Sequence, residues 1–203
     1  MNRLTPYRNC IVTALCGLAV AIVFATASIA QDQTGQDQTG QDQSLQERMD
    51  GWFAELADPD NPDWQRPYRS IELEWSKSGS PAFDLLLKRG QDAITAGDLP
   101  GAIEHLTALT DQAPDFAEGW NARATAYYLA GYYGPSILDI QRVLALNPRH
   151  FGALAGLGLI LQETGPKEQA KRAFEASLAI HPHQEGISQA LEALERETSG
   201  TDL

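Results

Sequence analysis

Cysteine is almost absent from this sequence. The chain has 203 residues and two cysteines, Cys10 and Cys16, and both lie in the stretch that we identify below as an export signal. Once that signal is removed, no disulfide, thiolate metal ligand or cysteine nucleophile remains. An exported domain of this kind must be stabilised by the packing of its core.

Positive charge is scarce as well. Lys and Arg number 15 against 27 Asp and Glu, so the formal net charge is −12 at pH 7. A chain of this charge is poorly suited to displacing counterions from a phosphate backbone, and we expect no nucleic acid partner. The apolar fraction of 43% is nevertheless typical of a globular protein, and the length suits one domain.

The motifs of common catalytic sites are missing too. The sequence contains no H-E-x-x-H, no G-x-S-x-G and no glycine-rich phosphate loop. Of the four histidines, His105, His150, His181 and His183, the last two flank Pro182 and offer a metal two ligands without a third. We therefore expect no catalytic residue, no metal site and no cofactor.

The first thirty residues have the three parts of an export signal. Arg3 and Arg8 precede an apolar run over residues 11–26, and Ser28 and Ala30 place small residues before a cleavage point at Gln31. We predict that residues 1–30 are a cleaved signal peptide and that the mature protein is periplasmic. The alternative is an uncleaved membrane anchor, since residues 11–30 are long enough to cross ~30 Å of hydrocarbon. Either topology puts the rest of the chain on the far side of the membrane.

A polar linker follows the signal. Residues 31–44 read QDQTGQDQTGQDQS and contain no hydrophobic side chain. Such a segment cannot bury a core, so we predict that it is disordered. Its acidity favours solubility and reach over recognition of a basic partner.

The remaining sequence repeats itself every 34 residues. Gly97, Gly131 and Gly165 recur at this spacing, and so do Pro114, Pro148 and Pro182. Apolar residues at helical spacing, a Gly at the midpoint and a closing Pro predict two helices joined by a tight turn in each copy. We expect the small residues to lie where the two helices cross. Further matched sets are Leu86, Trp120 and Leu154; Gly90, Ala124 and Gly158; Ala93, Tyr127 and Leu161; Ala102, Ser136 and Ala170; and Leu106, Ile140 and Phe174.

This pattern resembles the tetratricopeptide repeat (TPR) family, whose repeat reads W-x2-L-G-x2-Y, A-x3-F and P. In the third copy the matching residues are Leu154, Leu157, Gly158, Leu161, Ala170, Phe174 and Pro182. The stretches Glu118–Asn121 and Arg149–Gly152 are also similar to exported TPR proteins of alphaproteobacteria. The resemblance implies an all-α fold, a right-handed superhelical α-solenoid of three helix-turn-helix units over residues 83–116, 117–150 and 151–184.

Additional helices flank the three units. Residues 45–82 carry one apolar stripe through Trp52 and another through Trp64 and Trp75, and we interpret them as a Trp-rich N-terminal helical cap or a degenerate fourth repeat. Residues 185–203 contain an amphipathic helix that suits the open end of a solenoid as a C-terminal capping helix.

The resemblance implies that the first helix of each unit lines a concave groove. The stripe next to the core-facing one alternates apolar and amide side chains, which suits an extended or helical peptide. We therefore predict a protein or peptide ligand. The predicted groove residues are Leu87, Gln91, Ile94, Asn121, Thr125, Tyr128, Ala155, Leu159 and Gln162.

TPR domains that clamp a C-terminal carboxylate resemble one another in basic residues on this face. Here Leu87, Gly152 and Gly156 occupy the matching positions, and Asn121 alone stays near the pattern. A carboxylate clamp is therefore not expected. The two glycines either let a ligand backbone come close or serve helix packing.

The leading hypothesis is a non-catalytic periplasmic scaffold or adaptor that binds one protein segment. The second is an envelope assembly factor or chaperone that holds many unfolded clients weakly, and the third is an enzyme with a cryptic site. Nothing in the sequence indicates an oligomer. We also predict a buried ion pair between Arg123 and Asp139, which would join the two helices of the second unit.

Overall fold

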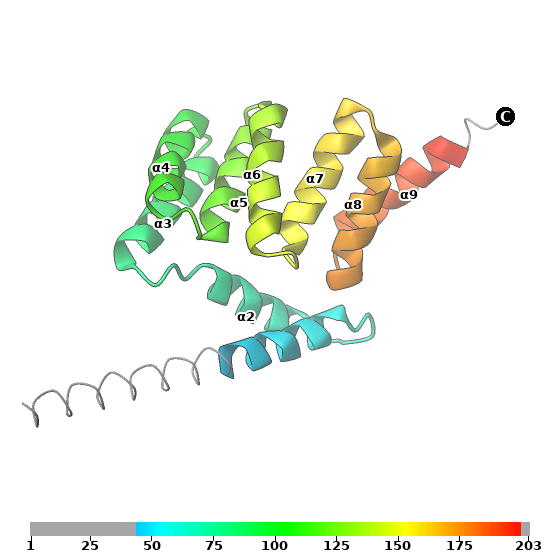
Figure 1. Ribbon diagram of the computed structural model, residues 1–203. Coiled ribbons are helices and arrows are strands. Elements are labelled where there is room, and N and C mark those ends of the chain that lie inside the picture. The colour runs from blue at the N-terminus through cyan, green and yellow to red at the C-terminus, as the bar shows by residue number, and fades with distance from the viewer. Residues whose placement is uncertain (1–43, 200–203) are drawn as a thin grey trace, which may run out of the picture. The chain divides into compact units, whose positions relative to one another are not determined.

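The computed structural model describes residues 44–199, which contain helices and no strand (Figure 1). The predicted signal peptide, residues 1–30, lies outside them, as does the predicted linker up to residue 43. The chain divides into residues 1–50 and 51–203. In the first unit residues 44–50 are helical, and in the second the helix continues to residue 57. No helix within residues 44–199 is long and apolar enough to span a bilayer.

Three helix pairs follow one another in the second unit and lie side by side in chain order (Figure 1). This arrangement confirms the predicted all-α solenoid. The pairs are α3 (Pro81–Thr95) with α4 (Leu99–Gln112), α5 (Ala117–Leu129) with α6 (Tyr133–Leu146), and α7 (Phe151–Thr164) with α8 (Lys167–Ile180).

The turn inside each pair depends on the repeated glycine. Gly97 and Gly131 have φ of 76°, and Gly165 has φ of 122°. Residues with a Cβ rarely adopt this left-handed backbone conformation, so a glycine here ends the first helix and allows the chain to reverse direction. The next helix begins directly after it, with the Asp98 carboxylate accepting a hydrogen bond from the Gly101 amide in the first pair.

The small residues lie where the paired helices cross, as predicted. A Cβ built on Gly90 would come within 2.4 Å of Leu106 Cγ, and one on Gly158 would come within 2.4 Å of Phe174 Cδ1. Ala102, Ser136 and Ala170 are fully buried at the corresponding positions of the second helices. The large side chain of one helix therefore occupies the space that the small residue of its partner leaves.

The predicted ion pair in the second unit is confirmed. Arg123 Nε lies 2.7 Å from Asp139 Oδ2, and its Nη2 lies 2.8 Å from Oδ1. Arg123 Nη1 also donates to Thr110 Oγ1 at 2.8 Å. The guanidinium thus joins α5 to α6 and also to α4 of the preceding pair.

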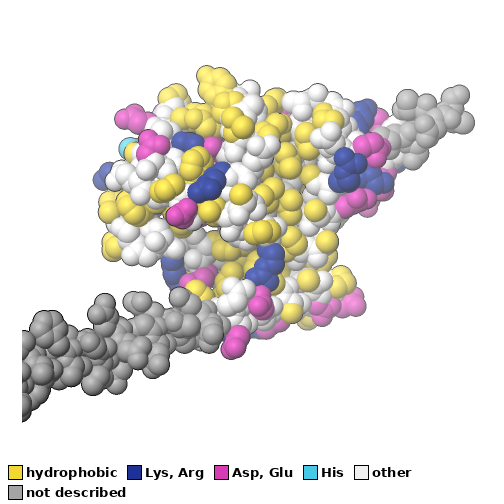
Figure 2. Space-filling view, viewed as in Figure 1, with side chains coloured by type: hydrophobic (Ala, Val, Ile, Leu, Met, Phe, Trp, Pro, Cys, Tyr) yellow, Lys and Arg dark blue, Asp and Glu magenta, His cyan; other side chains and the backbone are white. Residues whose placement is uncertain are grey.

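A last helix, α9 (Glu185–Ser199), covers the C-terminal end of the row. Leu194 is buried in a cluster with Ala170 and Phe174, and Lys171 Nζ lies 2.8 Å from Glu195 Oε1. Charged side chains cover the side of the molecule where α8 and α9 lie, while apolar side chains gather over the middle of the visible face (Figure 2).

The N-terminal segment is helical as predicted, and the structure shows what it covers. Helix α2 (Gln65–Trp75) crosses below the ends of the paired helices (Figure 1). Trp75 stacks on His150 with ring centroids 4.3 Å apart, and Trp64 stacks on His183 at 5.1 Å. Tyr68 and Trp75 also contact Phe151, so the aromatic contacts of this segment include the start of α7 and the turns that precede α7 and α9.

Candidate functional site

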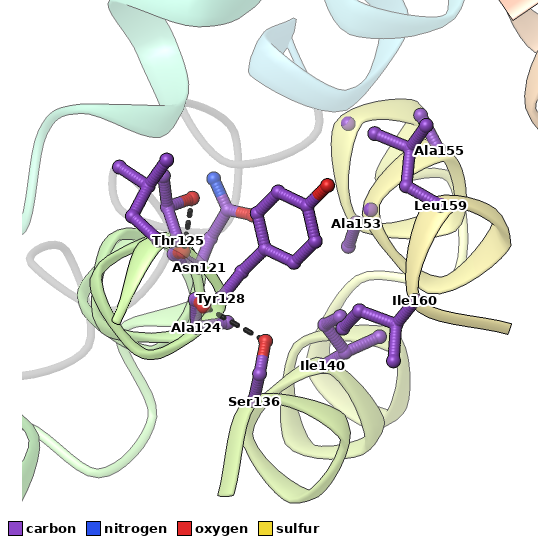
Figure 3. Close-up of a pocket in the computed structure, with 13 residues that line it drawn as sticks. Asn121, Ala124, Thr125, Tyr128, Ser136, Ile140, Ala153, Ala155, Leu159 and Ile160 are labelled. Atoms are coloured by element: carbon purple, nitrogen blue, oxygen red, sulfur yellow. Dashed lines mark hydrogen bonds between the residues drawn. The ribbon is translucent and has the colours of Figure 1, made fainter. Parts of the chain in front are cut away.

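A pocket of about 290 Å³ opens between α5 and α7 (Figure 3). The ring of Tyr128 projects from α5 toward Ala153, Ala155 and Leu159 of α7. Side chains of α6 close the inner end. The lining residues are Asn121, Ala124, Thr125, Tyr128, Leu129, Ser136, Ile140, Gly152, Ala153, Ala155, Gly156, Leu159 and Ile160.

Four of the six α7 residues that line this pocket are glycine or alanine, and the other two are Leu159 and Ile160. A Cβ on Gly152 would meet no atom closer than 3.5 Å, and one on Gly156 would meet only Ile140 Cδ1 at 3.7 Å. Gly158, by contrast, has no room for a Cβ. Helix packing therefore does not require glycine at residues 152 and 156, and close approach of a ligand there stays a prediction.

Tyr128 connects the two walls at the outer end of the pocket. Its hydroxyl donates to Glu163 Oε1 at 2.8 Å, and Tyr133 donates to the other oxygen of the same carboxylate. The hydrogen bond to Glu163, followed by burial and the Glu163 charge, raises the pKa of Tyr128 to about 12. The phenol therefore stays protonated at neutral pH and acts as a donor.

The other polar groups of the pocket are largely satisfied within the protein. Ser136 Oγ donates to the Ala124 carbonyl, and Thr125 Oγ1 donates to the Asn121 carbonyl. Asn121 Nδ2 donates to Glu118 Oε1 at 3.1 Å, which leaves its Oδ1 and one N–H to bond a ligand. The pocket thus offers an apolar cavity with one amide at its edge.

Five of the nine predicted groove residues line this pocket: Asn121, Thr125, Tyr128, Ala155 and Leu159. Leu87 was predicted on the exposed stripe, and this prediction is wrong: Leu87 is 2% exposed and packs with Ala122 and Ala126. Ile94 packs half-buried against the same core, Gln91 is exposed, and Gln162 is half-buried. These last three residues do not line the pocket.

The sequence reasoning missed the inner wall of the pocket. Ser136 and Ile140 come from the second helix of the pair, and Ile160 follows directly after a predicted groove residue. The 34-residue recurrence of the positions of Ser136 and Ile140 assigned them to the core. The pocket reaches that core beside Gly152 and Gly156, where α7 has no side chain to take up the space.

No group of three or more His, Cys, Asp or Glu side chains that would hold a metal ion occurs in the part of the chain that the structure describes.

Comparison with known proteins shows similarity to curated relatives and to solved structures. No family model matches the chain. It is 35% identical over 156 residues, 76% of either protein, to a TPR repeat-containing protein of Rhizobium etli. The Sgt2 TPR domain from Aspergillus fumigatus superposes with a TM-score of 0.57 at 22% identity, covering 61% of this chain and 83% of that domain. The first TPR of Spaghetti (RPAP3) bound to the HSP90 peptide SRMEEVD gives 0.55 at 22%, covering 57% and 91%.

Proposed function

This chain belongs to the tetratricopeptide repeat family, and we propose that it is a non-catalytic scaffold that binds a peptide or protein segment between α5 and α7. The observation that carries the proposal is the set of small residues that α7 presents to the pocket: Gly152, Ala153, Ala155 and Gly156. A ligand backbone can approach these residues closely, and one apolar side chain can enter the cavity beside Leu159.

The size of the pocket supports a selective site. Its volume of about 290 Å³ is at the lower limit of typical ligand sites, which span about 300–1,000 Å³. Such a volume suits one or two side chains, whereas a chaperone for many clients needs a broad apolar surface. The RPAP3 domain was solved with an acidic peptide. No Lys or Arg lines the pocket of this chain, so its ligand presents an apolar residue there.

The location proposed for this activity is the periplasm. The support is the Arg3 and Arg8 charges, the apolar run and the small residues Ser28 and Ala30. N-terminal sequencing of the protein from cell fractions tests it, and we expect a soluble chain that begins at Gln31. A membrane-bound chain that retains residues 1–30 would establish the uncleaved anchor instead.

Selection from a random twelve-residue peptide library on the purified protein tests the binding function. We expect selected peptides to share one large apolar residue and to bind with a single stoichiometry. Gly156→Leu, whose Cβ has room but whose side chain enters the pocket, should weaken binding at least tenfold without loss of helix.

The matched control is Leu138→Gln. Leu138 is 66% exposed on α6 and does not line the pocket, so this change should leave binding unaltered. Equal binding by the Gly156→Leu variant would refute the site. Many unrelated peptides that bind weakly would support the chaperone in its place.

A further inference from the structure

A second, larger cleft lies between α2 and the turns that precede α7 and α9. Its volume is about 550 Å³, and its walls include Trp64 and Tyr68 on one side and Phe151 and His181 on the other. Glu72 also lines it, one turn of α2 beyond Tyr68.

The cleft adjoins the pocket between α5 and α7. Asn121 and Gly152 line both. Gly152 has no side chain to separate the two spaces, and Asn121 lies where they meet. A segment bound in the pocket can therefore extend over Gly152 into the cleft.

The walls of the cleft are aromatic. The Tyr68 ring lies 6.2 Å from Trp64, 5.9 Å from Phe151 and 5.4 Å from His181. His181 is 4% exposed, and its Nδ1 is buried without a hydrogen-bond partner. Burial, followed by the charge of His183, lowers the pKa of His181 to about 4, so this wall carries no positive charge at neutral pH.

Glu72 is the one carboxylate among the described residues that line the cleft, and Glu118 adds a second negative charge near it. Desolvation and then the charge of Glu118 raise the pKa of Glu72, and burial followed by Glu72 and Glu118 raises the pKa of Tyr68. In both groups desolvation is the largest cause of the shift, and the neighbouring carboxylates add to it. Arg69 also lines the cleft, but its side chain is exposed.

We propose that this cleft binds the guanidinium group of an arginine side chain in the segment that occupies the α5–α7 pocket. A guanidinium is planar, stacks on aromatic faces such as those of Trp64 and Tyr68, and pairs with a carboxylate such as Glu72. The assignment to a single segment rests on the proposed function, whereas the arginine site itself is tested separately.

The probe is Nα-acetyl-L-arginine amide, titrated into the full chain while the Trp64 indole N–H is followed by NMR. The control probe is the citrulline analogue, which has nearly the same shape without the charge. We expect the citrulline compound to bind at least tenfold more weakly. Glu72→Gln should weaken arginine binding at least tenfold, and Arg69→Gln should strengthen it because a competing positive charge is removed.

The matched control variant is Glu74→Gln, which removes the same charge from α2 at a residue that does not line the cleft. Its arginine affinity should equal that of the unaltered protein. Equal binding of the two probes, equal loss in Glu72→Gln and Glu74→Gln, or weaker binding in Arg69→Gln would each overturn the proposal.

The two proposals fail separately. Gly156→Leu fills the α5–α7 pocket and should leave arginine binding unchanged, which shows that the probe occupies the cleft. Library peptides that bind while the arginine probe does not would refute the cleft alone. If arginine binds and selected peptides ignore Gly156→Leu, the α5–α7 pocket is refuted and the arginine site stands.

Discussion

The buried pair of Arg123 and Asp139 provides the most direct test of the reasoning about stability. Their side chains are 12% and 6% exposed, and two hydrogen bonds of 2.7 and 2.8 Å join them. Asp139→Ala leaves the guanidinium buried without its carboxylate. Such a change costs about 3–5 kcal/mol of unfolding free energy. In a domain of this size that cost corresponds to a drop of roughly 6–20 °C in melting temperature.

Two control variants separate the buried charge from a general effect of mutation. Asp115→Ala removes a pair with Arg142 whose side chains are 88% and 40% exposed, and it should cost less than ~1 kcal/mol. The third repeat has Leu157 and Ala173 at the positions of Arg123 and Asp139. The double variant Arg123→Leu with Asp139→Ala transfers that apolar pair and should recover most of the lost stability.

Urea unfolding followed by circular dichroism measures the unfolding free energy of Asp139→Ala, of Asp115→Ala and of the double variant. A midpoint for Asp139→Ala that matches the unaltered protein would refute the burial argument. A double variant that is as unstable as Asp139→Ala would show that the loss comes from something other than the unpaired charge.

Three further predictions concern the helix crossing at Gly158, the buried His181 and the pocket residue Tyr128. Gly158→Ala should destabilise the protein by about 1–3 kcal/mol because the new Cβ collides with Phe174, whereas Gly152→Ala should stabilise it by up to ~1 kcal/mol. Thermal melts in which both variants shift the melting temperature in the same direction would contradict the packing argument. Because burial lowers the pKa of His181 from 6.5 to about 4, the unfolded chain binds the proton first as the pH falls. From pH 7 to pH 5 the unaltered protein should therefore lose about 2 kcal/mol more unfolding free energy than His181→Phe. Equal losses in urea titrations at the two pH values would reject this prediction. Tyr128→Ala combined with Asn121→Ala should weaken a selected peptide by at least ~2 kcal/mol, roughly thirtyfold, while Tyr128→Phe retains most of the affinity, and unchanged binding by a folded double variant would exclude the groove.

The repeat period predicted the fold well because the features that specify it are local. Gly97 and its counterparts form the turns, and Gly90 and Gly158 admit the large side chains of their partner helices. Arg123 and Asp139 face each other across one helix pair, so their spacing alone indicated the ion pair. Each of these relations acts within about one repeat, where sequence distance and spatial distance correspond.

The place of α2 was not predictable in the same way. Trp75 meets His150 and Trp64 meets His183, and no period connects these residues. An aromatic stripe shows that a helix face is buried, but it does not show against what. The cleft that α2 forms was therefore missed, along with the environment of His181.

The helical phase of the first unit explains the error at Leu87. Residues 87, 121 and 155 share one register position, yet Leu87 packs into a core with α5, whereas Asn121 reaches the pocket edge. The first helix of each pair packs against the first helix of the next. Residues of the predicted groove stripe are therefore buried between these two helices wherever their side chains are large and apolar.

The same comparison explains why the binding surface lies over the second and third units. Between α3 and α5 the predicted groove is filled by the buried side chain of Leu87, and Ile94 packs against the core that Leu87 forms with α5. Between α5 and α7 the corresponding space stays open because α7 presents Gly152 and Gly156. Helix α2 packs on the turn before α7 and so forms its cleft beside this opening. A change that fills the α5–α7 space therefore affects recognition, whereas a change at Leu87 affects stability.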